Sequence, residues 1–342
     1  MLTDKILRKS ILIIGAFSLF SCSKKAKLPA IFPDIITEKT INDTDDPAIW
    51  LHPTDTKKTI IFGTDKETNG AIYAFNLEGK IIENKTIRNI RRPNNVDVAY
   101  GFQLNDSIRT DILVFTEREK QQIRVFSVPD MTPLDSGGFS VFKDETVLEK
   151  KLPMGVAFYK SPKDNSFYVI VGRKTGPNTN YLYQYKLEVN SDKIQSTLVR
   201  KFGAFSGKKE IEAIAVDSEM GFVYYADEMH CIRKYYAEPS KGNEEISCFG
   251  GAKFESDIEG IAIAKMNNRD GFIIVSDQQR GQFNIFDRNT NEFIKAVNLT
   301  TISTDGCDVV TVPLNNTFKS GLFVAMNDTQ QFYFYDLNKV LY

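Results

Sequence analysis

Short apolar runs separated by polar turns recur along most of the chain. Six of them continue, after a turn, into an alternating segment that is rich in aromatic and β-branched residues. These segments read IIFGTDKETNGAIYAF, ILVFTEREKQQIRVF, FYVIVGRKTGPNTNYLYQY, FVYYADEMHCIRKYY, FIIVSDQQRGQFNIF and LFVAMNDTQQFYFY. Alternation with a period of two residues, bounded by turn residues, is typical of β-hairpins. No long segment has the periodicity of an amphipathic helix, so the pattern predicts an all-β fold.

A further short strand precedes each hairpin, and the two together form a repeat. These strands read DDPAIWL, NNVDVAY, PMGVAF, IEAIAV, DIEGIAI and DGCDVVTV. Corresponding positions recur at intervals of 47 to 58 residues, at Asp46, Asp97, Gly155, Glu212, Glu259 and Asp308. Six repeats of three or four strands predict a six-bladed β-propeller, because each small sheet can bury both faces only against its neighbours. We expect residues 35–41, IITEKTI, to add the outer strand that closes the last blade.

The first residues have the pattern of an export signal. Lys5, Arg8 and Lys9 precede an apolar run at 11–20, ILIIGAFSLF, which is too short to span a bilayer as a stable helix. The run ends in LFSC and resembles a bacterial lipoprotein signal in which Cys22 receives the lipid.

This interpretation divides the chain into a signal peptide at 1–21, a tether at 22–37 and a propeller at 38–342. It predicts an exported protein that a lipid anchors to a bacterial membrane without crossing it. The sequence does not decide which membrane or which face carries the protein. The alternative is an ordinary signal peptide with an incidental cysteine.

Composition excludes some classes of function. The 342 residues carry a formal net charge of −1, so the basic excess of a nucleic-acid-binding protein is absent. Two histidines, His52 and His230, and the lack of an RHGxRxP-like segment argue against a histidine acid phosphatase. Cys231 and Cys248 either pair across neighbouring strands or remain thiols like Cys307, and both possibilities stay open. We expect a monomer, because a ring of repeats closes on itself.

Acidic residues recur where the first strand of each repeat begins, as in DTDDP at 43–47. The innermost strands of a propeller start near its axis, so we expect these acids to converge. Such a cluster needs a cation or raised pKa values, because like charges repel at low dielectric. Oxygen ligands without His or Cys suit Ca²⁺. The converging set is Asp45, Asp46, Asn95, Asp97, Glu212, Asp257, Glu259, Asp305 and Asp308. Taken singly, each acid is better explained as a solvated turn residue, but recurrence at one position of the repeat favours metal binding.

Basic residues occupy the turns inside the hairpins, at the same end of the predicted propeller. Beside an acidic ring that holds a cation, they would form a site for a multiply negative ligand, with Arg binding phosphate in bidentate fashion and Lys acting as a point charge. The alternative is ordinary exposed turn charge. The predicted ligand-binding residues are Lys66, Arg118, Arg173, Lys174 and Arg280.

Several stretches resemble the bacterial β-propeller phytases, also named alkaline phytases. The most specific are DTDDPAIWLHP, PNNVDVAYGFQL, SDIEGIAI and TDGCDV, and the matching stretches run in order over nearly the whole chain after the signal. The resemblance implies a six-bladed propeller that binds several calcium ions and hydrolyses the phosphomonoesters of phytate, as a 3-phytase does. It implies calcium ligands at Asp45, Asp46, Glu212, Glu228, Asp257, Glu259, Gln278 and Asp308.

Departures from the family pattern fall mainly in the expected secondary phosphate pocket. Ala99, Gly101, Glu67 and Met154 replace an Arg, an Asp, a Lys and a Tyr. The fourth repeat has Ala213 in place of a common Gly. The resemblance therefore leaves substrate preference and the first phosphate cleaved open.

The resemblance implies hydrolysis by metal-activated water without a covalent intermediate. Lys66, Arg118 and Lys174 would stabilise charge on the phosphate, and Glu212 would orient the water, which makes these four the predicted catalytic residues. Two alternatives remain. One is a non-catalytic, calcium-binding surface propeller that binds a ligand or partner, and the other is a calcium-dependent lactonase, which would not need the basic residues.

Overall fold

The computed structural model describes residues 28–191, 193–266 and 269–342. The predicted signal peptide at 1–21 and the predicted lipidation site at Cys22 lie outside the described residues, as does the first part of the predicted tether. Among the residues described, no helix is both long and apolar enough to cross a membrane.

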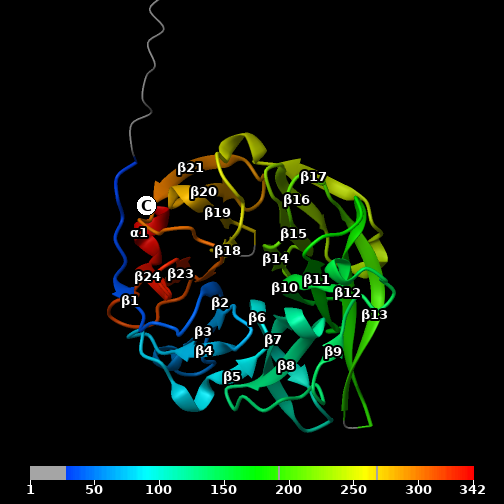
Figure 1. The fold of residues 1–342 in the computed structure, drawn as a ribbon. Coiled ribbons are helices and arrows are strands. Elements are labelled where there is room, and N and C mark those ends of the chain that lie inside the picture. Colours follow the sequence, from blue (N-terminus) through cyan, green and yellow to red (C-terminus); the bar gives the residue numbers. More distant parts are fainter. Residues whose placement is uncertain (1–27, 192, 267–268) are drawn as a thin grey trace, which may run out of the picture.

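Six four-stranded antiparallel sheets are arranged around a central axis, which confirms the predicted six-bladed propeller (Figure 1). In each sheet the strand that comes first in the repeat is innermost. The first sheet contains β2 (Thr44–Trp50), β3 (Ile60–Asp65), β4 (Gly70–Phe75) and β5 (Ile87–Ile90). The second contains β6 (Pro93–Gln103), β7 (Arg109–Glu117), β8 (Gln122–Val128) and β9 (Phe139–Ser140). The third contains β10 (Pro153–Lys160), β11 (Phe167–Arg173), β12 (Thr179–Asn190) and β13 (Lys193–Ala204).

The remaining sheets complete the ring. The fourth contains β14 (Ile214–Asp217), β15 (Phe222–Asp227), β16 (Cys231–Tyr236) and β17 (Glu245–Phe249). The fifth contains β18 (Ile261–Lys265), β19 (Gly271–Asp277), β20 (Gln282–Asp287) and β21 (Phe293–Asn298). The sixth contains β22 (Cys307–Val310), β23 (Leu322–Asn327), β24 (Gln331–Asp336) and β1 (Ile35–Ile36), and a short helix, α1 (Leu337–Leu341), follows it.

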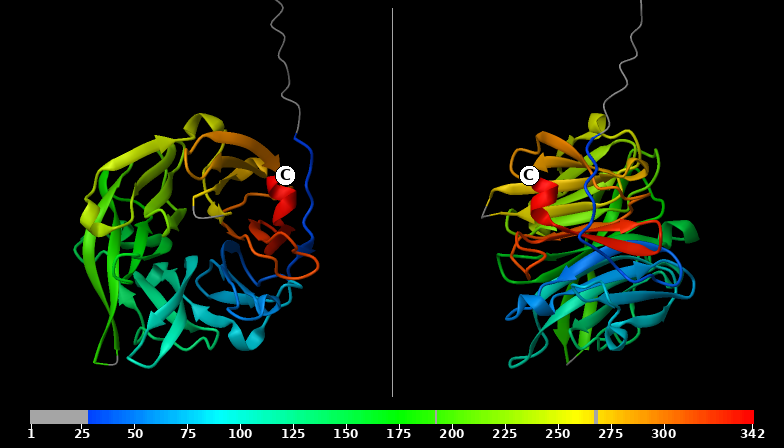
Figure 2. Two further views of the ribbon diagram at one scale, coloured as in Figure 1. Left: turned by 180° about the vertical axis from the view of Figure 1, so that it is seen from behind. Right: turned by 90° about the vertical axis from the view of Figure 1, so that its left-hand side faces the viewer.

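The N-terminal strand closes the ring, as predicted. Ile35 pairs with Phe334 and Ile36 with Tyr333, so β1 is the outermost strand of the sixth blade. This strand is shorter than the predicted 35–41 segment. Figure 2 shows the N-terminal segment running along the outside of this blade, close to α1. The last blade is thus built from both ends of the propeller, which ties them together.

Each hydrophobic cluster lies between two neighbouring blades. Val114 of the second blade packs in one cluster with Val169 of the third, and Ile49 of the first packs in another with Phe334 of the sixth. Strands are apolar on both sides because each blade is covered on both faces. Burying one such side chain contributes about 1.5–3 kcal/mol. The rigid packing between blades fixes where the inner strands begin.

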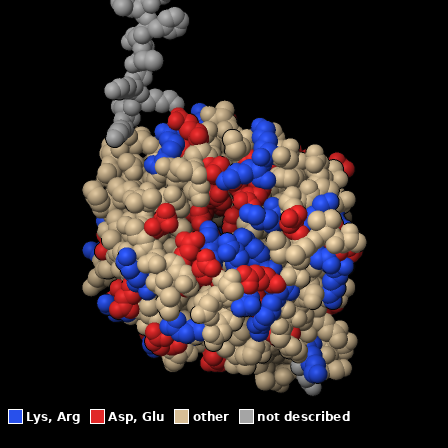
Figure 3. All heavy atoms as spheres, viewed as in Figure 1, with Lys and Arg blue, Asp and Glu red and all other residues tan. Residues whose placement is uncertain are grey.

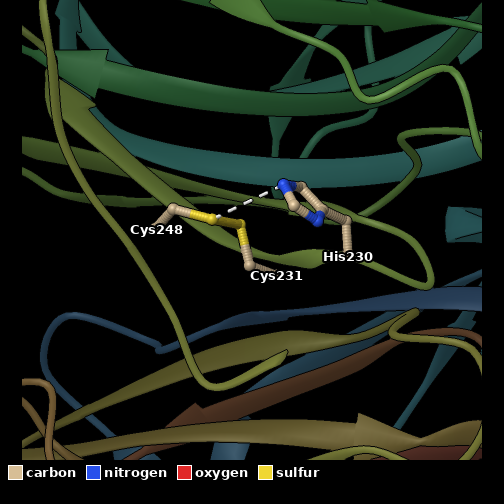
Figure 4. A group of neighbouring side chains, drawn as sticks. All are labelled: His230, Cys231 and Cys248. Carbon is tan, nitrogen blue, oxygen red and sulfur yellow. Dashed lines mark hydrogen bonds between the residues drawn. A yellow bond between two sulfur atoms is a disulfide. The ribbon is translucent and has the colours of Figure 1, made fainter. Parts of the chain in front are cut away.

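A disulfide joins β16 to β17 in the fourth blade. Cys231 and Cys248 are bonded, which settles the question that the sequence left open, and Cys307 is a free, buried cysteine. Figure 4 shows the His230 ring beside this bond, with Nε2 3.8 Å from the Cys248 sulfur. Cys231 begins β16 directly after the turn that carries Glu228. The disulfide therefore fixes the base of that turn to the outer strand.

Candidate active site

Carboxylates from the fourth and fifth blades form two overlapping groups within the described part of the chain. Glu210, Glu212 and Glu228 form one group, and Glu228, Asp257 and Glu259 form the other. Within each group the ligand oxygens all lie within 4.8 Å of one another. Acidic and basic side chains gather around the centre of one face of the ring (Figure 3). The predicted convergence of Glu212, Glu228, Asp257 and Glu259 is therefore observed.

Two further acids, Asp45 and Asp305, lie beside these groups and form ion pairs with Lys66. Lys66 places its ammonium 3.2 Å from Asp45 Oδ1 and 2.5 Å from Asp305 Oδ2. Gln278 donates a hydrogen bond from Nε2 to Asp305. The charge of Glu212 also acts on Lys66. Asp45 and Gln278, predicted from the first and fifth blades, are thus joined to the site through Lys66 and Asp305.

Several of these carboxylate oxygens are buried without a hydrogen-bond donor among the described residues. They are Asp45 Oδ2, Glu228 Oε1 and Glu259 Oε2. Burial raises the pKa of Glu228 to about 8, although Lys209 acts in the opposite direction. Burial also raises the pKa values of Asp45 and Glu259 well above the usual carboxyl range, and Glu212 adds to both shifts. Buried polar atoms in proteins almost always have partners, so these oxygens point to a missing ligand.

The donor set fits a hard divalent cation. Every candidate ligand in the two overlapping groups is a carboxylate oxygen, and no His or Cys belongs to either group. Ca²⁺ takes six to eight oxygen ligands in a flexible geometry, whereas Zn²⁺ prefers nitrogen and sulfur. A bound cation would also remove the repulsion that burial creates among these acids. The residues present therefore fit the calcium that the sequence predicts.

Two of the predicted basic residues besides Lys66, Arg118 and Lys174, lie near the acidic groups. Arg118 lies on a short 3-10 helix at Arg118–Lys120, is only 8% exposed, and its buried Nε has no hydrogen-bond partner among the described residues. Burial lowers its pKa, and the nearby charge of Glu212 opposes that shift. Lys174 follows β11, and its Nζ lies 2.8 Å from Glu210 Oε2. The structure thus brings together Lys66, Arg118 and Lys174, the three positively charged residues that the sequence predicts to be catalytic.

Neighbouring blades hold Glu212 in position. Asn94, which is fully buried on β6, donates a hydrogen bond from Nδ2 to Glu212 Oε1. Gly155 on β10 lies so close that a Cβ there would meet the Glu212 carbonyl oxygen at 1.9 Å. Glycine at this position of the third repeat therefore allows the third blade to approach the Glu212 loop closely.

Arg173 lies outside the site, which corrects one of the predicted ligand-binding residues. Its side chain is 1% exposed, and it donates to the carbonyl oxygens of Tyr181 at 2.9 Å and Asn180 at 2.7 Å. It also forms an ion pair with Glu145 and stacks on Phe142. Successive side chains of a strand point in opposite directions, so Arg173 turns into the blade while Lys174 faces the acids.

Arg280 is held by acids of its own blade. Its Nη1 lies 3.1 Å from Asp277 Oδ2 and 3.2 Å from Glu255 Oε1. Among the residues that the structure describes, Arg280 forms no ion pair with either acidic group. The predicted contact between Arg280 and a substrate has no support from this geometry.

Asp308 also lies outside both acidic groups and ties two blades together. Its Oδ2 accepts a hydrogen bond from the backbone N–H of Ile49 at 2.7 Å, and its Oδ1 accepts one from Val309. Burial raises its pKa to about 6. Asp97 accepts the Phe158 N–H at 2.6 Å in the same way. Asp308 was predicted as a calcium ligand, but both of its oxygens are engaged by backbone donors.

Asp46 makes a similar contact from the first blade, two residues earlier in its strand than Asp97. Its Oδ2 accepts the Val96 N–H at 3.0 Å, and burial raises its pKa well above the usual range. Asp46, Asp97, Asp308 and Glu259 line a cavity of about 400 Å³ between the inner strands of all six blades. Asp46 is thus another tie between blades, placed along the same axis as the acidic groups.

Two residues of the site were not predicted from the sequence. Glu210 belongs to one acidic group, and the Lys209 ammonium lies 2.9 Å from Glu228 Oε2 and 2.6 Å from Asp257 Oδ2. Both belong to the loop between β13 and β14. The only sequence signal for Glu210 was its place two residues before Glu212. The sequence of a loop does not show in which direction its charged side chains point.

The chain is similar to several known proteins. Residues 11–333 match the sequence model of a family described as Phytase. The chain is 28% identical over 303 residues to the 3-phytase of Bacillus subtilis (strain 168), and the match covers 83% of this chain and 74% of that protein. Among solved structures, the crystal structure of the computationally designed Ika8 protein has a TM-score of 0.43 and 11% identity, covering 84% of this chain and 70% of that one.

Proposed function

Because this chain belongs to the phytase family, we propose that it is a calcium-dependent phytase whose reaction takes place at the acidic and basic residues described above. Family membership and the 3-phytase relative support hydrolysis of phytate, a polyanion, and make the chain an enzyme. They leave no support for the two alternatives, a non-catalytic propeller and a lactonase. The calcium dependence and the role of each residue are our proposal.

One observation carries the assignment of the site. Among the described residues, several buried carboxylate oxygens have no hydrogen-bond donor, and the Nε of the nearby buried Arg118 has no acceptor. Opposite charges are thus held close together without forming hydrogen bonds to one another. Such groups are expensive to bury, and their pKa values are strongly shifted, which is typical of functional sites. A cation and a phosphate group would satisfy both sets at once.

The chain's own residues can then be given roles. Glu212, Glu228, Asp257 and Glu259 would hold calcium, which supplies a Lewis acid that offsets phosphate charge when it is bound. Arg118 would donate to the phosphate oxygens in bidentate fashion, because its guanidinium is preorganised by burial.

Lys66 and Lys174 would add positive charge around the phosphate group. Each is held by a carboxylate of the site, Lys66 by Asp45 and Lys174 by Glu210, so each ammonium already lies near the place where phosphate would bind. Glu212 would orient the attacking water, and Asn94 is a positioning residue that keeps the Glu212 carboxylate in place.

The test is phosphate release from phytate by the chain lacking residues 1–22, titrated with calcium after removal of metal. We expect no release in excess EGTA, recovery when calcium is restored, and no recovery with an equal excess of the calcium–EGTA complex alone. Release that continues unchanged in excess EGTA would exclude the calcium part of the proposal, whereas a calcium-loaded chain that cleaves no phytate would exclude the substrate.

We also propose that the exported chain is anchored by a lipid at Cys22, which the pattern LFSC supports. The Cys22→Ala chain should then move from the membrane fraction to the soluble fraction and should lose labelling by a radioactive fatty acid. A Cys22→Ala chain that is labelled and sediments like the parent chain would show that the cysteine is not the anchor.

A further inference from the structure

Lys209 occupies the centre of one acidic group. Its ammonium lies 2.9 Å from Glu228 Oε2, 2.6 Å from Asp257 Oδ2 and 3.7 Å from Glu259 Oε1. These three carboxylates are one of the two sets whose oxygens are close enough together to hold a metal ion. A single positive charge therefore lies where a doubly charged ion would bind.

The ammonium satisfies this group only in part. Glu228 Oε1 and Glu259 Oε2 remain buried without a hydrogen-bond partner among the described residues, although Glu228 is 0% and Glu259 6% exposed. An ammonium has three donors and one charge, whereas a calcium ion can take six to eight oxygens and carries two charges. The group is thus built for a ligand with more coordination capacity than Lys209 has.

The loop that carries Lys209 is fixed on either side of it. Ser206 donates from its backbone N–H to Asp227 at 2.8 Å, and Glu210 accepts the backbone N–H of Glu228 at 3.2 Å. The Lys209 side chain is nevertheless 36% exposed, whereas Lys66 in its acidic pair is 19% exposed. The ammonium of Lys209 can therefore move into solvent on its four-carbon stem without any change in the backbone of the loop.

We propose that Lys209 is an internal counter-ion for Glu228, Asp257 and Glu259, and that calcium enters this group only by displacing the Lys209 ammonium. This role rests on the proposed calcium centre. In the absence of metal, Lys209 offsets the repulsion among the buried acids. In its presence, the lysine competes with calcium and sets the concentration at which the group fills.

Replacement of Lys209 has two opposite consequences. Lys209→Met keeps the length of the side chain but removes the charge, so it removes the competitor and should tighten calcium binding by about tenfold, which corresponds to about 1.4 kcal/mol. The same variant should melt at a lower temperature than the parent chain when calcium is removed, because three neighbouring acids, two of them buried, lose their counter-ion.

The experiment is isothermal titration of calcium into the purified full-length protein after removal of metal, with thermal melting of the same samples in EGTA and in calcium. Lys208→Met is the matched control, because Lys208 is its exposed neighbour and donates to the Met229 carbonyl oxygen, away from the acids. Lys209→Arg retains the charge and should bind calcium no more tightly than the parent chain.

The outcomes separate this role from the proposed function. Tighter calcium binding by Lys209→Met, with parental affinity in Lys208→Met, supports the counter-ion role. Parental or weaker binding by Lys209→Met overturns it, and a parent chain that takes up no calcium overturns the calcium centre itself. If Lys209→Met does not fold without metal, the calcium-loaded protein is titrated with a chromophoric chelator, and the variant should require more chelator to release its calcium.

Discussion

The metal-free protein should lose stability as the pH rises from about 6 to about 8. Burial raises the pKa of Glu228 from its ordinary value of 4.5 to about 8, and Lys209 offsets only part of that effect. In this window the folded protein keeps a proton on Glu228 that the unfolded chain has already lost. Because the folded state binds more protons, its free energy of unfolding falls with rising pH.

The size of the effect follows from the proton count. A difference of one bound proton changes the free energy of unfolding by about 1.4 kcal/mol per pH unit, and the folded state has lost half of its proton at pH 8, so one group contributes about 2.3 kcal/mol between pH 6 and 8. Unfolding a domain of about 300 residues has an entropy of about 0.6 kcal/mol per kelvin near its melting temperature. The expected fall in melting temperature is therefore about 4 °C for Glu228 alone.

Two lysines do not change this slope. Burial alone would favour the neutral amines of Lys66 and Lys209, but the neighbouring carboxylates raise the pKa values of both far above this window. Saturating calcium should abolish the slope, because the bound ion requires deprotonated carboxylates, as the unfolded chain already has.

Differential scanning calorimetry of the metal-stripped protein in chelator, at both pH values and with and without calcium, provides the assay. Glu228→Gln is the control, since it removes the titrating group and should reduce the fall. A metal-stripped protein that melts at the same temperature, or higher, at the more alkaline pH would refute the reasoning, as would an equal fall in saturating calcium.

Three other predictions follow from the geometry. Replacing both Cys231 and Cys248 by serine should lower the free energy of unfolding by about 3 kcal/mol, because the bond closes a loop of 17 residues; an unchanged urea midpoint would contradict this. Arg118→Met should lower kcat/KM for phytate by about a hundredfold or more in steady-state assays. Its melting temperature should not fall, since its Nε has no hydrogen-bond partner among the described residues, and parental kinetics would contradict its role. Arg173→Met should do the reverse, destabilising by about 3–5 kcal/mol in urea because Glu145 loses its partner, with kcat/KM retained in the folded fraction.

The blade count and the end of the propeller that carries the site could be predicted from the sequence, because both depend on the period of the chain. Strands that are apolar on both faces, repeated six times, have few ways to be buried, and a ring is one of them. Glu212 and Glu259 lie just before the inner strands β14 and β18, and they converge because the inner strands do. The spacing of the repeats, however, aligns Asp308 with Glu259, whereas the strand pairing makes Gly306 equivalent to Gly260. Asp305 therefore corresponds to Glu259, and Asp308 lies three residues further on, where it accepts the Ile49 N–H.

The hydrophobic pattern of the sequence did not predict the direction in which individual side chains point. Arg173 and Lys174 are adjacent, and only the register of β11 decides which of them turns towards Phe142 and which towards Glu210. The proposed role of Lys209 could not be predicted either, because it depends on acids from two other loops, Glu228 after β15 and Asp257 and Glu259 before β18, which meet only in the folded ring.

The two lysines held by acids bear on how a polyanion can bind at all. In the absence of metal, Lys66 pairs with Asp45 and Asp305, and Lys209 pairs with Glu228 and Asp257, so neither ammonium is free to bind phosphate. A divalent cation among the acids would take over the carboxylate oxygens and release positive charge towards the ligand. Calcium and phosphate should therefore each favour binding of the other, since thermodynamic coupling between two sites is reciprocal. The acidic and basic side chains therefore form one site, in which they pair with each other in the absence of metal and a bound cation would separate them.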